Sequence, residues 1–243
     1  TCALPMLSIS AMGASNLKHT IAVLWTGRHD RAIIGYHGFF ASEPRFLSRL
    51  SFALTPIVSR LVARTIVVSK TLRETLVRRW RAKARRTTVI YNPIVWGELP
   101  PTSQKGDIEK RPPLVLAVGR LVALKQFDML LRAFARLGRP DARLVILGEG
   151  PERARLEAEI GKLGLAGRVE LPGYVAEPWG YYEQASCLAI SSRSESFGMI
   201  VVEALAHGLP VVTTDCQGPT EVLDRKSTRL NSSHIPLSRM PSS

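Results

Sequence analysis

Residues 113–148, PLVLAVGRLVALKQFDMLLRAFARLGRPDARLVILG, decide the fold class of this chain. The run Leu114–Gly119 is short and apolar, as a buried strand is, and Arg143–Gly148 has the same character. Between them, the apolar residues of FDMLLRAFARL recur at helical spacing. Parallel strands need a crossover of this length, which is usually a helix. The stretch therefore predicts an α/β fold.

Three further strands follow, with the sequences RVELPGY, CLAISS and PVVTT. Helices are expected from Pro151, around Tyr181–Ala185 and from Gly198 to Gly208. Five strands with intervening helices predict a doubly wound parallel sheet that is covered on both faces. In such a sheet, ligands bind beyond the carboxyl ends of the strands, where the strand order reverses. If the usual doubly wound order holds, that point lies here between the first and the fourth strand.

The first third of the chain is less regular. AIIGYHG predicts a strand that ends at His37, and RTIVVSK predicts another that ends at Ser69. Asn92 precedes a proline, which restricts it to extended geometry and marks a connection. We expect a partial first domain, a linker and a second domain, over residues 1–92, 93–112 and 113–224.

The segment ESFGMIVVEALAHGLPVV, residues 195–212, places two glutamates around an apolar run. A buried carboxylate needs a hydrogen-bond donor or a cation, from the protein or from a ligand. Glu195 precedes the expected helix, and Glu203 lies about 7.5 Å further along its axis. The pair could contact two parts of an elongated ligand, while the free N–H groups at the helix start favour an anion. Alternatively, Glu195 is a capping acid and Glu203 pairs with a neighbouring Arg or backbone group.

Two cations, Arg120 and Lys125, follow the first strand. Taken alone, this loop also reads as ordinary surface charge. Opposite Glu195 and a helix start, the same cations suggest a diphosphate site, because Arg offers a planar fork to phosphate oxygens and Lys a point charge. The carboxylates would suit diols, since each oxygen accepts hydrogen bonds. A diphosphate flanked by diols describes a nucleotide sugar.

The formal net charge of +13 is concentrated in two stretches. Residues Arg60–Arg86, the basic cluster, hold ten Lys or Arg against one acid, and residues 225–243 add four basic residues. Within the cluster, LRETLVRRWRAKARR predicts a helix with Leu72, Leu76 and Trp80 at four-residue steps. The cluster reads as a solvated helix face or as a surface for anionic lipid headgroups. Nucleic acid is disfavoured, because no recognised reading motif is present.

Other features narrow the class further. No apolar run reaches the roughly 18 to 20 residues of a membrane span. Cys2, Cys187 and Cys216 have no metal-like spacing and fit reduced thiols in the cytoplasm. Six of the eighteen residues after Arg225 are Ser, and periodicity vanishes there. Because this end also resembles translated sequencing-adapter DNA, we expect residues 225–243 to be a non-native, disordered tail.

Four segments resemble the donor-binding domain of family 4 glycosyltransferases, which are retaining enzymes of the GT-B fold. These segments are GRLVALKQFDMLLRAF, LVILGEGPERARLE, LPGY and SSRSESFGMIVVEALAHGLPVVTTDCQGPTEVL. The resemblance is strong over residues 114–223 and weaker over residues 65–94. It implies an α/β fold of two Rossmann-like doubly wound domains, of which the N-terminal, acceptor-side domain is incomplete.

The resemblance also implies roles for the charged residues. Arg120 and Lys125 would hold the diphosphate and stabilise the charge that grows on the leaving group. Glu195 would bind the sugar hydroxyls, and Glu203 the ribose diol. His37 matches a position that faces the transferring sugar, although a structural histidine fits this single residue equally well. No protein nucleophile is expected.

The backbone near Gly173 would lie beside the base. Ser196 replaces the Gly more often found after the first Glu, which affects the shape of the sugar pocket. The remaining residues assigned to nucleotide-sugar binding are Gly119, Tyr174, Phe197 and Gly198.

The implied reaction moves a sugar from a nucleoside diphosphate to a hydroxyl of a glycan or a lipid-linked glycan, with retention of configuration. No cofactor or metal is expected, because the chain has no Asp-x-Asp metal site. The resemblance suggests bacterial polysaccharide biosynthesis by a cytoplasmic enzyme that the basic cluster could hold at the inner face of the membrane. Two alternatives remain: a non-catalytic nucleotide-sugar-binding fragment, and a sugar phosphorylase or synthase of the same fold.

Overall fold

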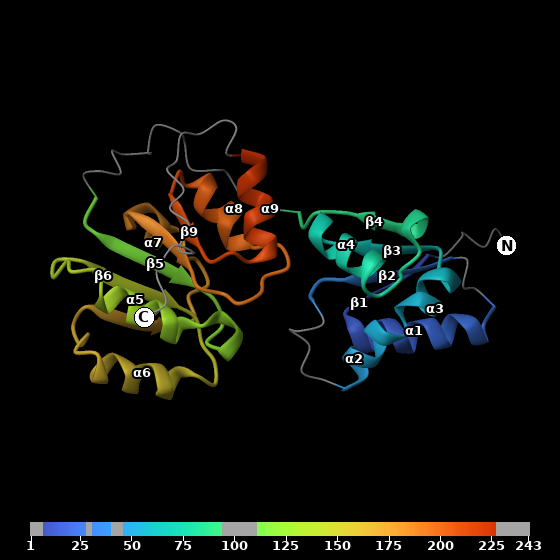
Figure 1. Ribbon diagram of the computed structural model, residues 1–243, viewed down its shortest axis with the longest axis horizontal. Helices are drawn as coiled ribbons and strands as arrows, with labels where there is room; N and C mark the ends of the chain where they lie inside the picture. The colour runs from blue at the N-terminus through green and yellow to red at the C-terminus, as the bar shows by residue number, and fades with distance from the viewer. Residues whose placement is uncertain (1–6, 28–30, 40–45, 94–110, 227–243) are drawn as a thin grey trace. The chain divides into compact units, whose positions relative to one another are not determined.

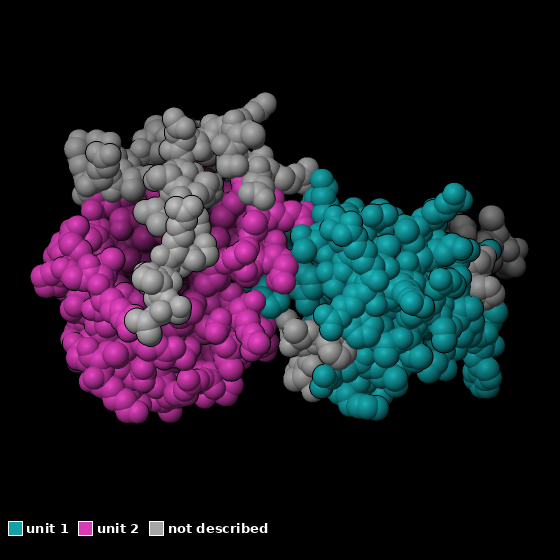
Figure 2. Space-filling model, in the orientation of Figure 1, with its two compact units in different colours: residues 1–93, 194–197 teal, residues 94–193, 198–243 magenta. Residues whose placement is uncertain are grey.

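A computed structural model describes residues 7–27, 31–39, 46–93 and 111–226 (Figure 1). The chain divides into two compact units, Thr1–Pro93 with Ser194–Phe197 and Ile94–Arg193 with Gly198–Ser243 (Figure 2). Most of the predicted linker, residues 94–110, and most of the predicted tail, residues 227–243, lie outside the described residues. 

The first unit contains a parallel four-stranded sheet in the order β1-β2-β3-β4. Its strands are β1 (Ser8–Ala11), β2 (Ala32–Tyr36), β3 (Arg64–Val67) and β4 (Thr87–Val89). Its helices are α1 (Gly13–Trp25), α2 (Phe46–Ala53), α3 (Thr55–Leu61), α4 (Lys70–Arg78) and the short 3-10 helix η3 (Ala84–Arg86). The strand expected to end at His37 ends one residue earlier, and the strand expected to end at Ser69 ends two residues earlier.

The core of this unit forms around an aromatic pair. Tyr36 of β2 and Phe52 of α2 are almost fully buried, and their ring centroids lie 5.0 Å apart. The buried Tyr36 hydroxyl lies 3.2 Å from Ser51 Oγ and from Thr55 Oγ1, so its polar atom is satisfied inside the core. Leu72 and Leu76 of α4 have no exposed surface.

The helix expected to continue through Trp80 ends at Arg78 instead. Arg81 takes a left-handed conformation, with φ of 50°, and the N–H of Ala82 donates to the Leu76 carbonyl over 2.9 Å. A left-handed residue closed by such a hydrogen bond stops a helix. Left-handed residues are usually Gly or Asn, so the sequence carried no signal for this stop.

The second unit is a parallel five-stranded sheet in the order β7-β6-β5-β8-β9. Its strands are β5 (Leu114–Val118), β6 (Arg143–Leu147), β7 (Val169–Gly173), β8 (Cys187–Ile190) and β9 (Val211–Thr213). Its helices are α5 (Phe127–Ala135), α6 (Arg153–Lys162), α7 (Trp179–Gln184), α8 (Met199–Ala206), α9 (Gln217–Lys226) and the 3-10 helix η6 (Ala123–Lys125). The first strand of this series, β5, is central and pairs with the second and the fourth. This confirms the doubly wound prediction.

Right-handed crossovers explain how the helices are distributed. The chain moves from β5 to β7 in one direction, which places α5 and α6 on one face, and from β7 to β9 in the other, which places α7 and α8 on the opposite face (Figure 1). The main core lies beneath α5 and α6, where Leu131, Leu144 and Ile146 are fully buried.

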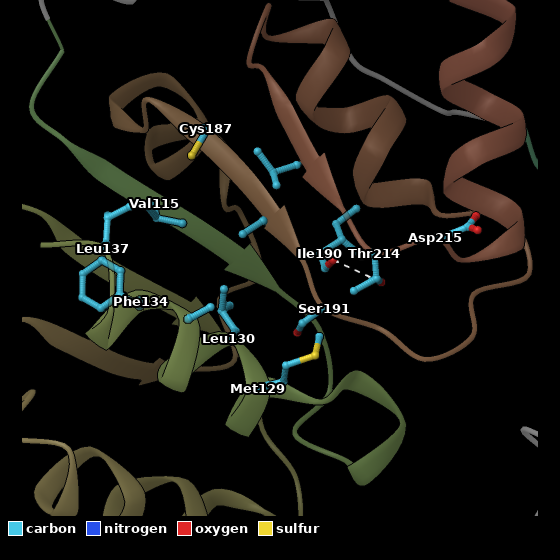
Figure 3. Close-up of a pocket in the computed structure, with 13 residues that line it drawn as sticks. Val115, Met129, Leu130, Phe134, Leu137, Cys187, Ile190, Ser191, Thr214 and Asp215 are labelled. Atoms are coloured by element: carbon cyan, nitrogen blue, oxygen red, sulfur yellow. Dashed lines mark hydrogen bonds between the residues drawn. The ribbon is translucent and has the colours of Figure 1, made fainter. Parts of the chain in front are cut away.

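On the α5 side, no crossover helix of the described chain covers β8 and β9. A groove of about 520 Å³ lies there (Figure 3). Met129 and Phe134 of α5 line one wall, Cys187 and Val212 of the strands line the floor, and Thr214 lies at the carboxyl end of the sheet. The groove is therefore mainly apolar, and none of the predicted site residues lines it.

Candidate functional site

The loops that follow β5 and β8 meet where the strand order reverses. The N–H of Arg193 donates to the Leu124 carbonyl over 2.9 Å, and Ser191 Oγ donates to the Lys125 carbonyl over 2.7 Å. Ser191 is almost fully buried, which limits the competition of water for this bond. The loop that carries Lys125 is thus fastened to the loop that leads to Glu195.

Lys125 is half-buried and lies against Gly119. A Cβ atom at residue 119 would lie 3.2 Å from Lys125 Cε and 3.5 Å from Nζ. Any side chain there would displace the lysine, so Gly119 provides the space that Lys125 occupies. Lys125 ends η6, and Gln126 turns the chain into α5 through a left-handed conformation, with φ of 49°. Arg120 is exposed next to Gly119.

Two glycines of the β6–α6 loop pack directly against the main chain of the loop that follows β5. A Cβ at Gly148 would lie 2.0 Å from the Gly119 carbonyl oxygen, and one at Gly150 would lie 2.3 Å from that of Leu121. The N–H of Leu121 donates to the Glu149 carbonyl over 2.8 Å. The two loops therefore pack main chain against main chain. Neither glycine was predicted from the sequence to be part of the site, although the repeated Gly of LGEG indicates a close approach of the backbone.

Gly173 ends β7 beside these loops. Its carbonyl accepts from the Gly148 N–H over 2.8 Å, and its φ of +93° is one that side chains rarely adopt. A Cβ there would lie 2.8 Å from Glu149 Oε1. Gly173 is buried, whereas 77% of the next residue, Tyr174, is exposed.

The helix α8 starts at Met199, next to Gly198 as its N-cap in a left-handed conformation, with φ of +82°. A Cβ at Gly198 would lie 3.1 Å from Pro219 Cγ and 3.2 Å from Val201 Cγ2. The free N–H groups at such a start favour an anion. Glu195 and Ser196 are half-buried in the segment that precedes the helix. Phe197 is buried, and its ring lies 5.6 Å from that of Tyr91.

Glu203 lies on α8, half-buried, and accepts a hydrogen bond from the Tyr182 hydroxyl over 2.7 Å. Its partner is thus neither the Arg nor the backbone group considered from the sequence. Burial, followed by the charge of Glu203, raises the pKa of Tyr182. The phenol therefore stays protonated and serves as a donor. Tyr182 was missed because the sequence does not show which α7 residue meets α8.

His37 lies in the first unit, directly after β2, and is exposed. Its Nε2 lies 3.2 Å from the position that a Cβ on Gly35 would take, so the ring folds back along the strand. Its assignment to the sugar remains a prediction.

Among residues 7–27, 31–39, 46–93 and 111–226, no group of three His, Cys, Asp or Glu is placed to hold a metal ion. Among the same residues, no helix is long and apolar enough to cross a membrane.

Family comparisons match nearly all of the described chain. Residues 100–231, more than half of the 243, match the family described as glycosyl transferases group 1, and residues 13–95 match glycosyltransferase family 4. The chain belongs to the group 1 glycosyltransferases. The two matches cover both stretches of the resemblance described from the sequence, residues 114–223 and 65–94.

Curated relatives agree with this assignment. The chain is 36% identical over 144 residues to the N-acetylgalactosamine-N,N'-diacetylbacillosaminyl-diphospho-undecaprenol 4-alpha-N-acetylgalactosaminyltransferase of Campylobacter jejuni. This match covers 58% of the chain and 38% of the relative. The chain is 29% identical over 221 residues to an uncharacterized glycosyltransferase of Methanocaldococcus jannaschii. This match covers 86% of the chain and 56% of the relative.

A solved structure shares the fold. Anabaena HepE, crystallised in complex with UDP and glucose, superposes with a TM-score of 0.73 at 21% identity over 88% of this chain and 61% of that one. The likeness shows two parallel-sheet α/β domains of the GT-B kind, as the sequence predicted. The chain spans less than two thirds of the length of each of these three proteins.

Proposed function

We propose that the chain belongs to a retaining glycosyltransferase that moves a sugar from a nucleoside diphosphate to a hydroxyl of a glycan or a lipid-linked glycan. The observation that carries this proposal is the fastening of the Lys125 loop to the β8 loop at the strand-order reversal. Two relatives support it. Anabaena HepE was crystallised with UDP and glucose, and the Campylobacter relative is named for a diphospho-undecaprenol-linked acceptor.

The proposed roles are those that the family resemblance implies. Arg120 and Lys125 contact the diphosphate and stabilise the negative charge that develops on it as the glycosidic bond breaks. The N–H groups at the start of α8 add partial positive charge. Glu195 orients the sugar through its hydroxyls, and Glu203 binds the ribose diol. The acceptor hydroxyl attacks the anomeric carbon from the face that the nucleoside diphosphate leaves, and the departing phosphate takes the hydroxyl proton. The sugar is therefore transferred directly, and no protein nucleophile is needed.

The chemistry can be tested by product analysis. The chain is incubated with UDP-glucose, UDP-N-acetylgalactosamine or GDP-mannose and a set of glycan and lipid-diphosphate acceptors, and the products are examined by NMR. Transfer with retained anomeric configuration supports the proposal. Inversion contradicts the retaining mechanism. Use or release of a free sugar phosphate indicates the phosphorylase or synthase alternative, and binding without turnover indicates the binding alternative.

The basic cluster carries the proposed contact with an anionic membrane at the cytoplasmic face. Eight of its ten basic side chains are exposed, and two are half-buried. The half-buried ones hold the fold together: Arg86 donates to the carbonyls of Arg60 and Val62 over 2.8 and 2.9 Å, and Arg73 to that of Thr87 over 3.0 Å. Each of the eight exposed basic side chains would contribute about 1 kcal/mol to the binding free energy when it lies near an anionic lipid surface.

Vesicle co-sedimentation tests this contact. The chain ended at Asp224 is mixed with neutral or phosphatidylserine-containing vesicles at low and high salt. Binding to anionic vesicles at low salt only is expected, because salt screens exposed charges. Failure to bind them at low salt, or a need for residues 225–243, would leave the cluster as a solvated surface.

A further inference from the structure

Glu203 is held in one orientation by a residue of a different helix. The Tyr182 hydroxyl on α7 donates to Oε2 of Glu203 on α8 over 2.7 Å. Tyr182 has no exposed surface and Glu203 is half-buried, so the bond is partly shielded from water. A hydrogen bond to an ionised oxygen is roughly twice as strong as one between neutral groups. One carboxylate oxygen is thus anchored, and the carboxylate keeps further acceptor capacity for a ligand.

An aromatic stack holds Tyr182 in turn. Its ring lies 5.2 Å from that of His207 with the planes 20° apart, and His207 stacks on Trp179 at 5.7 Å and 11°. His207 Nδ1 lies 3.0 Å from the Glu203 carbonyl oxygen, which can only accept, so Nδ1 carries the proton. The stack therefore joins α7 to the end of α8. It limits the movement of Tyr182 and with it that of the carboxylate.

We propose that Tyr182 is a positioning residue that presets the Glu203 carboxylate for the ribose diol of the nucleotide. This inference rests on the proposed function. Ordering a flexible side chain during binding weakens affinity, and a side chain that is already ordered avoids that cost. Tyr182 contacts no part of the nucleotide itself. It acts by orienting Glu203 before the ligand arrives.

The test compares ribose with 2′-deoxyribose. Tyr182→Phe keeps the ring and its stacking and removes only the hydroxyl. Calorimetry with UDP, GDP and their 2′-deoxy analogues should show an about three- to tenfold loss of affinity for the ribonucleotide, the scale of ordering one side chain. The deoxy analogue should bind almost as before. Tyr36→Phe is the matched control, because it removes another buried tyrosine hydroxyl, in the first unit.

A double-mutant cycle shows whether the effect passes through Glu203. If it does, Tyr182→Phe has no further effect on ribose discrimination once Glu203→Gln is present. Three outcomes would overturn the role of Tyr182, provided that the wild-type chain binds nucleotide. Tyr182→Phe could weaken the ribo- and deoxyribonucleotides equally, it could leave both affinities unchanged, or its loss of affinity could add to that of Glu203→Gln in the double variant. Failure of the wild-type chain to bind either ribonucleotide would instead remove the proposed function, and this inference with it. Melting curves of each variant confirm that it folds.

Discussion

Lys125 carries the diphosphate assignment, because its loop is tied to the β8 loop and its side chain lies over Gly119. Lys125→Ala should weaken UDP or GDP binding by about 1.5 to 3 kcal/mol, the scale of a charged hydrogen bond. Isothermal calorimetry measures the loss. Lys162→Ala removes the same charge from the exposed end of α6 and should leave affinity unchanged. Equal losses of nucleotide affinity in the two variants would show that Lys125 acts only through the net charge of the protein and does not contact the diphosphate.

The reactivity of the Cys187 thiol provides a second test at the residue scale. Burial raises the pKa of this thiol, and Cys187 lines the groove on the α5 side of the sheet. Because only the thiolate is alkylated, iodoacetamide should modify Cys187 more slowly than free cysteine at pH 8. Its rate should still rise with pH where that of free cysteine has levelled off. Peptide mass spectrometry follows the site individually, and a rate equal to that of free cysteine would contradict the effect of burial.

At the scale of elements, the loop after β5 and the loop after β6 are packed so closely that a side chain at Gly150 should be destabilising. Gly150→Ala would place a Cβ 2.3 Å from the Leu121 carbonyl oxygen, and neither main chain can yield easily. We expect a loss of about 1 to 3 kcal/mol in the free energy of unfolding, the scale of overpacking. Urea denaturation measures it.

Gly161→Ala is the matched control for that substitution. Gly161 lies within α6, and a Cβ there meets nothing within 4 Å. Alanine favours the helix, so this variant should gain about 0.5 to 1 kcal/mol. Opposite signs for two identical substitutions eleven positions apart in the chain would confirm that packing, and not glycine content, decides the outcome. A neutral result for Gly150→Ala would show that the loops can separate.

The sequence predicted elements well where periodicity is strong and poorly where a single residue stops an element. The strands of the second unit begin and end within two residues of their predicted limits. The helix expected from Pro151 begins at Arg153, and the helix expected to continue through Trp80 ends at Arg78, three residues before the left-handed Arg81. Such stops depend on local backbone geometry that side-chain patterns do not encode.

At the scale of the whole molecule, the groups proposed to bind phosphate belong to the second unit, so nucleotide should protect that unit selectively. Hydrogen exchange with and without UDP should show slower exchange in residues 119–126 and 198–202. The amides of α1, which lies in the first unit, should exchange as before. Uniform slowing over the whole chain would instead indicate general stabilisation, and no change near α8 would contradict its proposed role in phosphate binding.

The arrangement of the candidate site was predictable in part. The doubly wound pattern brought the loops of β5 and β8 together, because the carboxyl ends of neighbouring parallel strands share one edge. Gly148, Gly150 and Tyr182 were not predicted, since each matters through a partner distant in sequence. Periodicity shows which face of an element is buried, but not which residue it meets there.

The loops at the strand-order reversal are joined largely through main-chain atoms, from Gly119, Leu121 and Glu149 to Arg193 and Leu124. Such a framework depends little on the identity of the side chains that it displays, provided that the glycines remain. Laboratory evolution aimed at a new donor preference should therefore randomise the exposed or half-buried positions of these loops and keep the glycines constant. Libraries built in this way should retain a high fraction of folded members while they sample different ligand chemistry.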